Sequence, residues 1–278
     1  VILAKIPVEK FNEILRELSK LSEVKKIWLD YKVKKCLNES IPLIGGFTAW
    51  NLGFNGTNMR IAILDTGVYA EHPDFYYPDG TPKVELQLSF IDYDLDGIPD
   101  ESPTDYNGHG THCAGIAAGT GNLSSGNFTG VAPGAKIWNL KVLCREGWGY
   151  LNWILSAIEF ASLGPDGAPY TGDEADVLSM SFGAPILSDG SDPLSLACDW
   201  SFLFAGRIPV TSAGNEGPDY FTVGIPAAGK YVIAVGASTK QDEIIWFSSC
   251  GPTLDLRVKP DVIAVSYTHL TLPTTERV

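Results

Sequence analysis

The sequence predicts an α/β fold, a mostly parallel, twisted sheet flanked by helices. Short apolar segments of strand character alternate with Gly-bounded segments whose apolar residues recur at helical spacing. This alternation is typical of βαβ units, whose strands are parallel and buried on both faces. Hydrophobic residues occupy 45% of the 278 positions, a fraction that excludes an intrinsically disordered chain.

The first 37 residues predict a small separate unit. Val1–Ile6 is an apolar run, apolar residues from Phe11 to Leu21 recur at helical spacing, and Val24–Val33 is again extended. This unit carries 9 Lys or Arg and 5 Asp or Glu, a charge of +4. The rest of the chain carries 11 Lys or Arg and 28 Asp or Glu, a charge of −17. The two parts are therefore expected to attract each other.

The elements of the larger unit follow one another in a regular order. The expected strands are Arg60–Leu64, Val84–Phe90, Ala135–Leu143, Asp176–Ser181, Ile208–Ser212 and Tyr231–Val235. The expected helices are His109–Ala118, Tyr150–Leu163 and Pro193–Phe204. In open sheets of this class, ligands bind at the carboxyl ends of the strands. Polar residues just after a strand are therefore the first candidates for chemistry.

Charge and hydropathy exclude two kinds of partner. The net charge of −13 and the sequence pI near 4.7 argue against nucleic acid, whose phosphates require a basic face. No run approaches the roughly 18 consecutive apolar residues of a transmembrane helix, so no membrane span is expected. The five cysteines form no spaced framework, and their pairing stays open.

Three polar residues occupy positions that favour catalysis. Asp65 follows a buried strand, where a carboxylate needs a hydrogen-bonded or cationic partner. His109 begins a helix among small residues, which allow a substrate backbone to approach closely. Asn215 lies just past another strand, where its amide can donate to a developing oxyanion. Each residue taken alone is more often structural, as a helix cap or a core histidine, and only the combination is specific.

The segments Ile61–Gly67 and Asn107–Gly115 match two of the three signatures of the subtilisin-like serine endopeptidases, the subtilases. The chain resembles this family over about Asn38–Ala264. The third signature, a Gly-Thr-Ser-Met-type loop that bears the nucleophilic serine, is absent from the sequence. The resemblance implies serine endopeptidase activity by family and predicts that this truncated chain is itself inactive.

The resemblance implies a role for each of the three residues. Asp65 would hold the imidazole of His109 in the useful tautomer and stabilise its cationic form. His109 would take the proton from a serine hydroxyl and later give it to the leaving amine. Asn215 would stabilise the tetrahedral oxyanion.

The resemblance also implies a cleft for protein or peptide substrates. Two segments would bind an extended substrate between them as an added strand: Gly147, Trp148 and Gly149, and Ser181, Phe182 and Gly183. Gly214 and Gly224 would form the walls of a deep pocket that accepts a large apolar side chain. Ile225–Pro226 lies where the family can carry a cis proline.

Residues 1–37 resemble part of an inhibitory propeptide, a small α+β unit of ferredoxin-like fold, and residues 38–264 an incomplete catalytic domain. The processing bond would lie near Leu37 and Asn38, and the propeptide would be a partner of its own enzyme. The family implies an extracellular or secreted protein. The chain begins at Val1 rather than Met, so we expect its N-terminus to be incomplete, and a missing signal peptide says nothing against secretion.

Residues 265–278 have no counterpart in subtilases. They resemble the in-frame translation of an adapter used in preparing sequencing libraries. We therefore expect this tail to be non-native, the alternative being a natural divergent tail.

One loop has the spacing of a calcium-binding segment. Asp92, Asp94, Asp96 and Asp100 point several hard oxygens at one centre, as in an EF-hand-type loop, although Pro103 stands where that loop has its bidentate Glu. The alternative is a solvated acidic loop. Asp74 matches a calcium ligand of the subtilases, so the resemblance implies structural calcium at either place.

A second function remains open beside the protease. A non-catalytic member of the family would keep the cleft and bind peptide strands or calcium. A purely structural α/β domain is disfavoured by the combination of Asp65, His109 and Asn215. The sequence does not indicate an oligomeric state.

Overall fold

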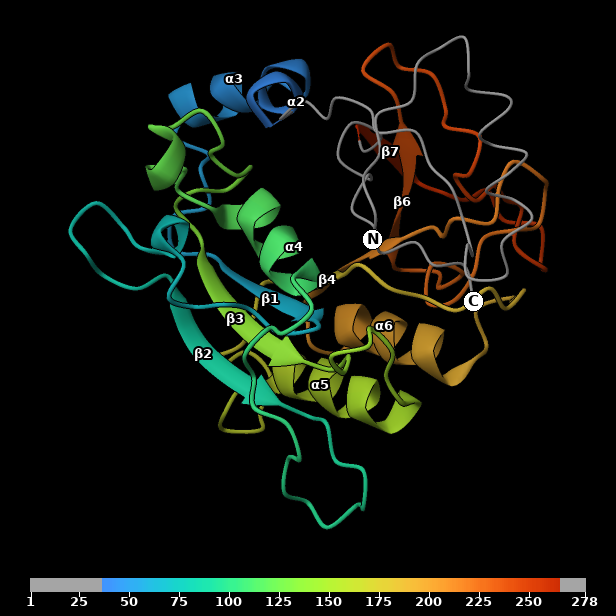
Figure 1. Cartoon of the computed structure of the whole chain (residues 1–278). Coiled ribbons are helices and arrows are strands. Elements are labelled where there is room, and N and C mark those ends of the chain that lie inside the picture. The colour runs from blue at the N-terminus through green and yellow to red at the C-terminus, as the bar shows by residue number, and fades with distance from the viewer. Residues whose placement is uncertain (1–36, 266–278) are drawn as a thin grey trace, which may run out of the picture. The chain divides into compact units, whose positions relative to one another are not determined.

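The computed structural model describes residues 37–265 (Figure 1). The chain divides into two units, Val1–Lys34 and Lys35–Val278, and every described residue belongs to the second. The elements predicted for the first unit, and the tail after Val265, lie outside the described residues. No helix among the described residues is long and apolar enough to cross a membrane.

A seven-stranded parallel sheet forms the centre of the described unit (Figure 1). The strands are β1 (Arg60–Asp65), β2 (Val84–Ser89), β3 (Lys136–Lys141), β4 (Val177–Met180), β5 (Ile208–Ser212), β6 (Ile233–Ser238) and β7 (Val262–Val265). Their order is β2-β3-β1-β4-β5-β6-β7, and every neighbouring pair is parallel. The predicted fold class is confirmed, and all strands end at the same edge of the sheet.

The three long helices lie where the sequence predicts them. They are α4 (His109–Ala118), α5 (Leu151–Leu163) and α6 (Pro193–Leu203). Four short helices were not predicted: α2 (Leu37–Leu43), α3 (Gly46–Asn51), η2 (Pro73–Phe75) and η3 (Asn122–Ser124). Leu37 and Asn38, between which the processing bond is predicted, begin α2.

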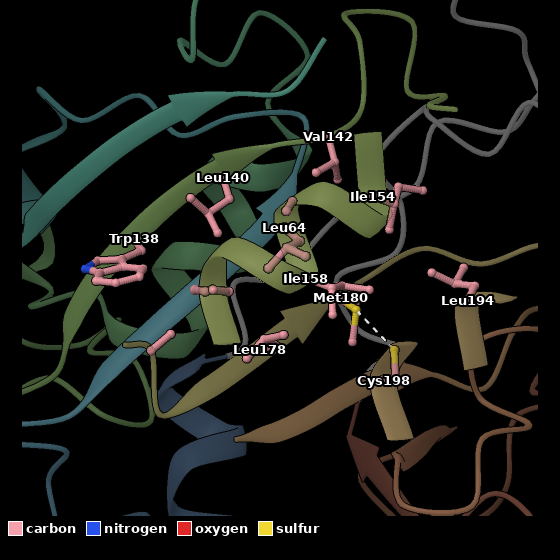
Figure 2. Close-up of a cluster of buried hydrophobic side chains, with 14 of the residues drawn as sticks. Leu64, Trp138, Leu140, Val142, Ile154, Ile158, Leu178, Met180, Leu194 and Cys198 are labelled. Carbon is pink, nitrogen blue, oxygen red and sulfur yellow. Dashed lines mark hydrogen bonds between the residues drawn. The ribbon is translucent and has the colours of Figure 1, made fainter. Parts of the chain in front are cut away.

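The helices cover opposite faces of the sheet, and because strand side chains alternate in direction, neighbouring residues of β1 pack against different helices. Leu64 of β1 belongs to a buried cluster with Ile158 of α5 and Leu194 of α6. Ile63, the preceding residue, belongs to a second cluster with Ala114 and other residues of α4. Figure 2 shows the first cluster, in which side chains from β1, β3 and β4 face α5. β1 is therefore buried on both sides.

We predict that truncating the α5-facing core destabilises the fold strongly. Leu178 of β4 is 0% exposed, so Leu178→Ala removes buried methyl groups and leaves a cavity. The free energy of unfolding should fall by about 2–5 kcal/mol in urea denaturation. Leu196→Ala on α6, where the side chain is 51% exposed, is the matched control and should change it by about 0.5 kcal/mol or less. Equal losses in both variants would contradict this description of the core.

Candidate functional site

A buried carboxylate and an imidazole meet at the carboxyl edge of the sheet. Asp65, the last residue of β1, is 1% exposed, and His109 is the first residue of α4. His109 Nδ1 lies 2.7 Å from Asp65 Oδ1, which also accepts the backbone N–H of Thr66 at 2.7 Å. Asp65 Oδ2 has no hydrogen-bond partner among residues 37–265. The fold thus brings together two of the three predicted catalytic side chains, 44 positions apart in sequence.

Glycine at position 110 makes this approach possible. A Cβ atom there would lie 2.1 Å from the carbonyl oxygen of Gly67 and 3.1 Å from Cβ of Asp65. Any side chain would push the first turn of α4 away from β1. The small residue beside His109 therefore serves the contact between helix and strand, in addition to the substrate access expected from the sequence.

The environment of His109 favours its protonated form. The hydrogen bond with Asp65, helped by Cys113 and opposed by burial, raises the pKa of His109 to about 11. Cys113 lies one turn further along α4, with Sγ 3.9 Å from His109 Nδ1. Burial raises the pKa of the Cys113 thiol, so this sulfur stays protonated and is not an activated nucleophile. The His109 side chain remains 31% exposed and accessible to a ligand.

The predicted substrate segments leave the sheet on both sides of β1. Ser181, Phe182 and Gly183 follow β4, and Gly147, Trp148 and Gly149 lie between β3 and α5. Because β3 and β4 flank β1 in the sheet, the two segments start on either side of Asp65.

The segment after β4 contacts the predicted pocket wall. Ala184 and Ile225 form an antiparallel bridge, with each backbone N–H donating to the other carbonyl at 3.0 Å. A Cβ at Gly224 would lie 2.2 Å from the carbonyl oxygen of Ala184, and a Cβ at Gly183 would lie 2.7 Å from that of Ile225. Only glycine fits at these two positions. The Ile225–Pro226 peptide bond is cis, at the position where the resemblance allows a cis proline.

Asn215 lies three residues beyond β5 and is exposed. Its turn is held by Ser249, whose N–H donates to the Gly214 carbonyl at 3.1 Å and whose Oγ accepts the N–H of Glu216 at 3.0 Å. Gly214 has a φ of +111°, and a Cβ there would lie 2.7 Å from Ser249 Oγ. Asn215 thus projects from the same edge of the sheet as Asp65, two strands away.

An aromatic cluster holds the half-exposed ring of Trp148. Its indole stacks on Trp153 of α5 at 6.1 Å between centroids, and Tyr150 approaches edge-on at 5.4 Å. Tyr93, from the acidic loop, packs against both tryptophans. The acidic loop is therefore in contact with one of the predicted substrate segments.

Three of the predicted metal-binding residues lie together in that acidic loop. One carboxylate oxygen from each of Asp92, Asp94 and Asp100 lies within 4.8 Å of the others. Asp96 is outside this group, and its Oδ1 accepts the N–H of Ile98 at 2.7 Å. Asp74 is also outside the group, and its Oδ1 accepts the N–H of Leu123 at 2.8 Å. Hard carboxylate oxygens in such a group are suitable ligands for Ca²⁺.

The sequence analysis missed two charged residues that support the site. Asp105 accepts hydrogen bonds from Thr66 and from the start of α4. Lys141 of β3 is fully buried, and its Nζ donates to the Thr66 carbonyl at 2.8 Å and lies 3.2 Å from a Glu101 oxygen. The sequence did contain a signal for Lys141, since it is a lysine inside an otherwise apolar predicted strand. A buried ammonium group requires hydrogen-bond or charged partners, so such a lysine indicates a polar network.

Comparison with known proteins finds similarity over most of the chain. Residues 56–277 match the subtilase family. Serine protease AprX of Bacillus subtilis (strain 168) is 34% identical over 262 residues, which are 89% of this chain and 55% of that protein. Minor extracellular protease Vpr of the same strain is 36% identical over 207 residues, 73% of this chain and 23% of that protein. The chain thus spans about half or less of these relatives' lengths.

A solved structure shows the same fold. Sphericase is similar with a TM-score of 0.61 and 33% sequence identity. The match covers 76% of this chain and 67% of the Sphericase chain.

We predict that Asp65→Asn lowers the pKa of His109 toward its ordinary value of 6.5, measured by NMR titration of the imidazole. A pKa raised on folding stabilises the protein fully below about pH 6.5, and this stabilisation is lost as the pH rises toward about 11. The loss of stability caused by Asp65→Asn should therefore be largest near pH 6 and shrink as the pH rises. Glu159→Gln, an exposed change on α5, is the charge-matched control. An unaltered His109 titration in folded Asp65→Asn would refute the coupling.

Proposed function

The chain belongs to the subtilase family, and we propose that the protein of which it is part is a serine endopeptidase acting through an Asp–His–Ser arrangement. The observation that carries the proposal is the 2.7 Å hydrogen bond between buried Asp65 and His109 at the carboxyl edge of the sheet. A similar protein named a serine protease supports the same class of reaction.

In this proposal Asp65 and His109 act as one unit. Asp65 accepts a hydrogen bond from Nδ1–H of His109, and the second ring nitrogen acts as the base for a serine hydroxyl once it has lost its own proton. Because the pKa of His109 is raised to about 11, this base form becomes more populated as the pH rises. As the hydroxyl attacks the peptide carbonyl, the imidazole becomes a cation that the buried carboxylate stabilises. The same proton then passes to the leaving amine. No segment of the 278 residues matches the family's Gly-Thr-Ser-Met loop, so in this proposal the serine belongs to a part of the protein outside this sequence.

Asn215 is proposed as the donor to the oxyanion. Its exposed position after β5, at the edge where Asp65 lies, supports an amide that reaches a bound peptide carbonyl. The substrate would run as an extended strand between Gly147–Gly149 and Ser181–Gly183. A large apolar side chain before the cleaved bond would enter the pocket beside Gly214 and Gly224.

Maturation and location complete the proposal. Residues 1–37 would be an inhibitory propeptide whose charge of +4 favours encounter with the acidic remainder of the chain. Cleavage near Leu37 and Asn38 would release the enzyme. Secretion is supported by the name of one similar protein, a minor extracellular protease.

The test is to complete the domain with a downstream segment of a related subtilase that carries the Gly-Thr-Ser loop. We predict that the completed protein cleaves casein and that the 278-residue chain alone does not. His109→Ala should lower kcat by about 10⁶ and Asn215→Ala by about 10²–10³, both magnitudes taken from a subtilisin. Asn152→Ala, an exposed change on α5, should leave kcat unchanged.

Two results would contradict this proposal. Casein cleavage by the unmodified chain that a serine-directed inhibitor abolishes would show that its nucleophile lies within the 278 residues. A folded completed domain that binds peptides without cleaving them would favour the non-catalytic peptide-binding alternative. The gene sequence downstream of Ala264 distinguishes the same two functions, according to whether a Gly-Thr-Ser loop follows.

We also propose that Asp92, Asp94 and Asp100 bind a structural Ca²⁺. One carboxylate oxygen from each residue lies within 4.8 Å of the other two. The backbone of Asp92 is held against the core, because its carbonyl oxygen accepts a hydrogen bond from Trp153 Nε1–H at 3.0 Å. A bound cation would neutralise the repulsion among the three carboxylates. It would thereby stabilise the loop that carries Tyr93 against Trp148.

We predict that Ca²⁺ raises the melting temperature of the chain relative to EDTA. At about 100 times its Kd, the ion should add about 2.7 kcal/mol to the free energy of unfolding. The double variant Asp92→Asn/Asp94→Asn should lose this response. Asp96→Asn removes one negative charge from the same loop outside the group and should keep the response. Equal Ca²⁺ responses in all variants would refute this site.

A further inference from the structure

We propose that Asp105 is a positioning residue that sets the geometry between Asp65 and His109. Its carboxylate joins the turn after β1 to the first turn of α4, the two backbone segments that carry these side chains. The inference rests on the proposed function only for the catalytic role of the Asp65–His109 couple, since the contacts themselves belong to the fold.

The carboxylate of Asp105 accepts five hydrogen bonds from residues on both segments. Oδ1 accepts Thr66 Oγ1 at 3.0 Å, the N–H of Asn107 at 2.9 Å and the N–H of Gly108 at 2.8 Å. Oδ2 accepts the N–H of Thr111 at 2.9 Å and its Oγ1 at 2.6 Å. One side chain thus satisfies donors from the turn after β1 and from both sides of His109.

Asp105 takes the place of an ordinary helix cap. The N-cap residue of α4 is Gly108, in the left-handed conformation, and it has no side chain to cap the free N–H groups of the first turn. Asp105, three residues earlier, supplies the missing acceptor to Thr111. It also places negative charge beside the positive end of the helix dipole.

Thr66 connects Asp105 to the carboxylate of Asp65 through hydrogen bonds. Its hydroxyl donates to Asp105 and accepts the N–H of Gly110 at 3.0 Å, while its own N–H donates to Asp65 Oδ1 at 2.7 Å. Thr66 is almost fully buried, so these bonds do not compete with solvent. The chain Asp105–Thr66–Asp65 and the chain Asp105–Gly108–His109 therefore meet at the hydrogen bond between Asp65 and His109.

The sheet holds Asp105 itself in place. Lys141 Nζ donates to the carbonyls of Thr66 at 2.8 Å and Thr104 at 3.3 Å, which ties the two segments to β3. Asn139 Nδ2, also from β3, donates to the Pro103 carbonyl at 2.9 Å. A Cβ at Gly67 would lie 2.5 Å from that same carbonyl oxygen, so the segments are in direct contact.

The charge of Asp105 is part of this role. Burial favours its neutral acid, but hydrogen bonds from Thr111 and from backbone N–H groups outweigh burial and lower the pKa of Asp105. It is therefore ionised at neutral pH and accepts at both oxygens. An asparagine in its place has a single acceptor oxygen, so its NH₂ group would face donors on one side of the network.

The test is the titration of His109 by NMR in the 278-residue chain carrying Asp105→Asn. The groups facing His109 are Asp65 from β1 and Cys113 from α4, and neither is changed by the substitution. We expect the midpoint of the His109 titration to fall by about one pH unit or more and the Nδ1 proton resonance to be lost. A folded variant with the parent titration would overturn the proposal, even if its melting temperature were lower.

A second pair of variants keeps the test decisive if Asp105→Asn does not fold. Thr66→Val removes the bridging hydroxyl at nearly constant volume and should shift the His109 titration, whereas Thr66→Ser keeps the hydroxyl and should not. Equal titrations in these two would overturn the proposal. Asp65→Asn separates the two claims: if it alone shifts His109, Asp105 is not a positioning residue. If neither change shifts His109, the Asp65–His109 couple of the proposed function fails.

Discussion

The site depends on the burial of one carboxylate. Asp65 is almost completely removed from water, and one of its oxygens has no partner among residues 37–265. A buried charge of this kind is costly unless it is hydrogen-bonded, so its position determines what must surround it. The imidazole of His109 and the N–H of Thr66 share the other oxygen, and α4 must approach β1 closely enough to make this possible. Gly110 and the contacts of Asp105 are consequences of that requirement.

The parallel sheet brings further segments to the edge where Asp65 and His109 meet. Because β3 and β4 flank β1 and the strands are parallel, the segments after β3, β4 and β5 leave the sheet from the edge where Asp65 lies. The two-sided core keeps β1 rigid, with α4 on one face and α5 on the other. The aromatic contact between Tyr93 and Trp148 links the acidic loop to the same edge. A proposed substrate strand and a proposed ion site are therefore neighbours.

The sequence predicted the long, periodic elements well and the supporting contacts poorly. β5 and α4 have the predicted bounds, because each is an apolar run bounded by small or polar residues. α2 was missed because Pro42 lies inside it, and β7, which has four residues, was not predicted. The pairing of Asp65 with His109 was predicted from their motifs. The roles of Asp105 and Thr66 were not, because they follow from hydrogen bonds between distant segments that no local pattern encodes.

The central claim is that Asp65, His109 and Asn215 act on a single peptide carbonyl. A crystal structure of the chain with a peptide that has a large apolar residue tests it most directly. We expect an extended peptide between Gly147–Gly149 and Ser181–Gly183, with one carbonyl oxygen about 3 Å from Asn215 Nδ2 and the His109 ring beside the carbonyl carbon. A peptide bound elsewhere, or one whose carbonyl contacts Asn215 while His109 lies remote from it, would contradict the account.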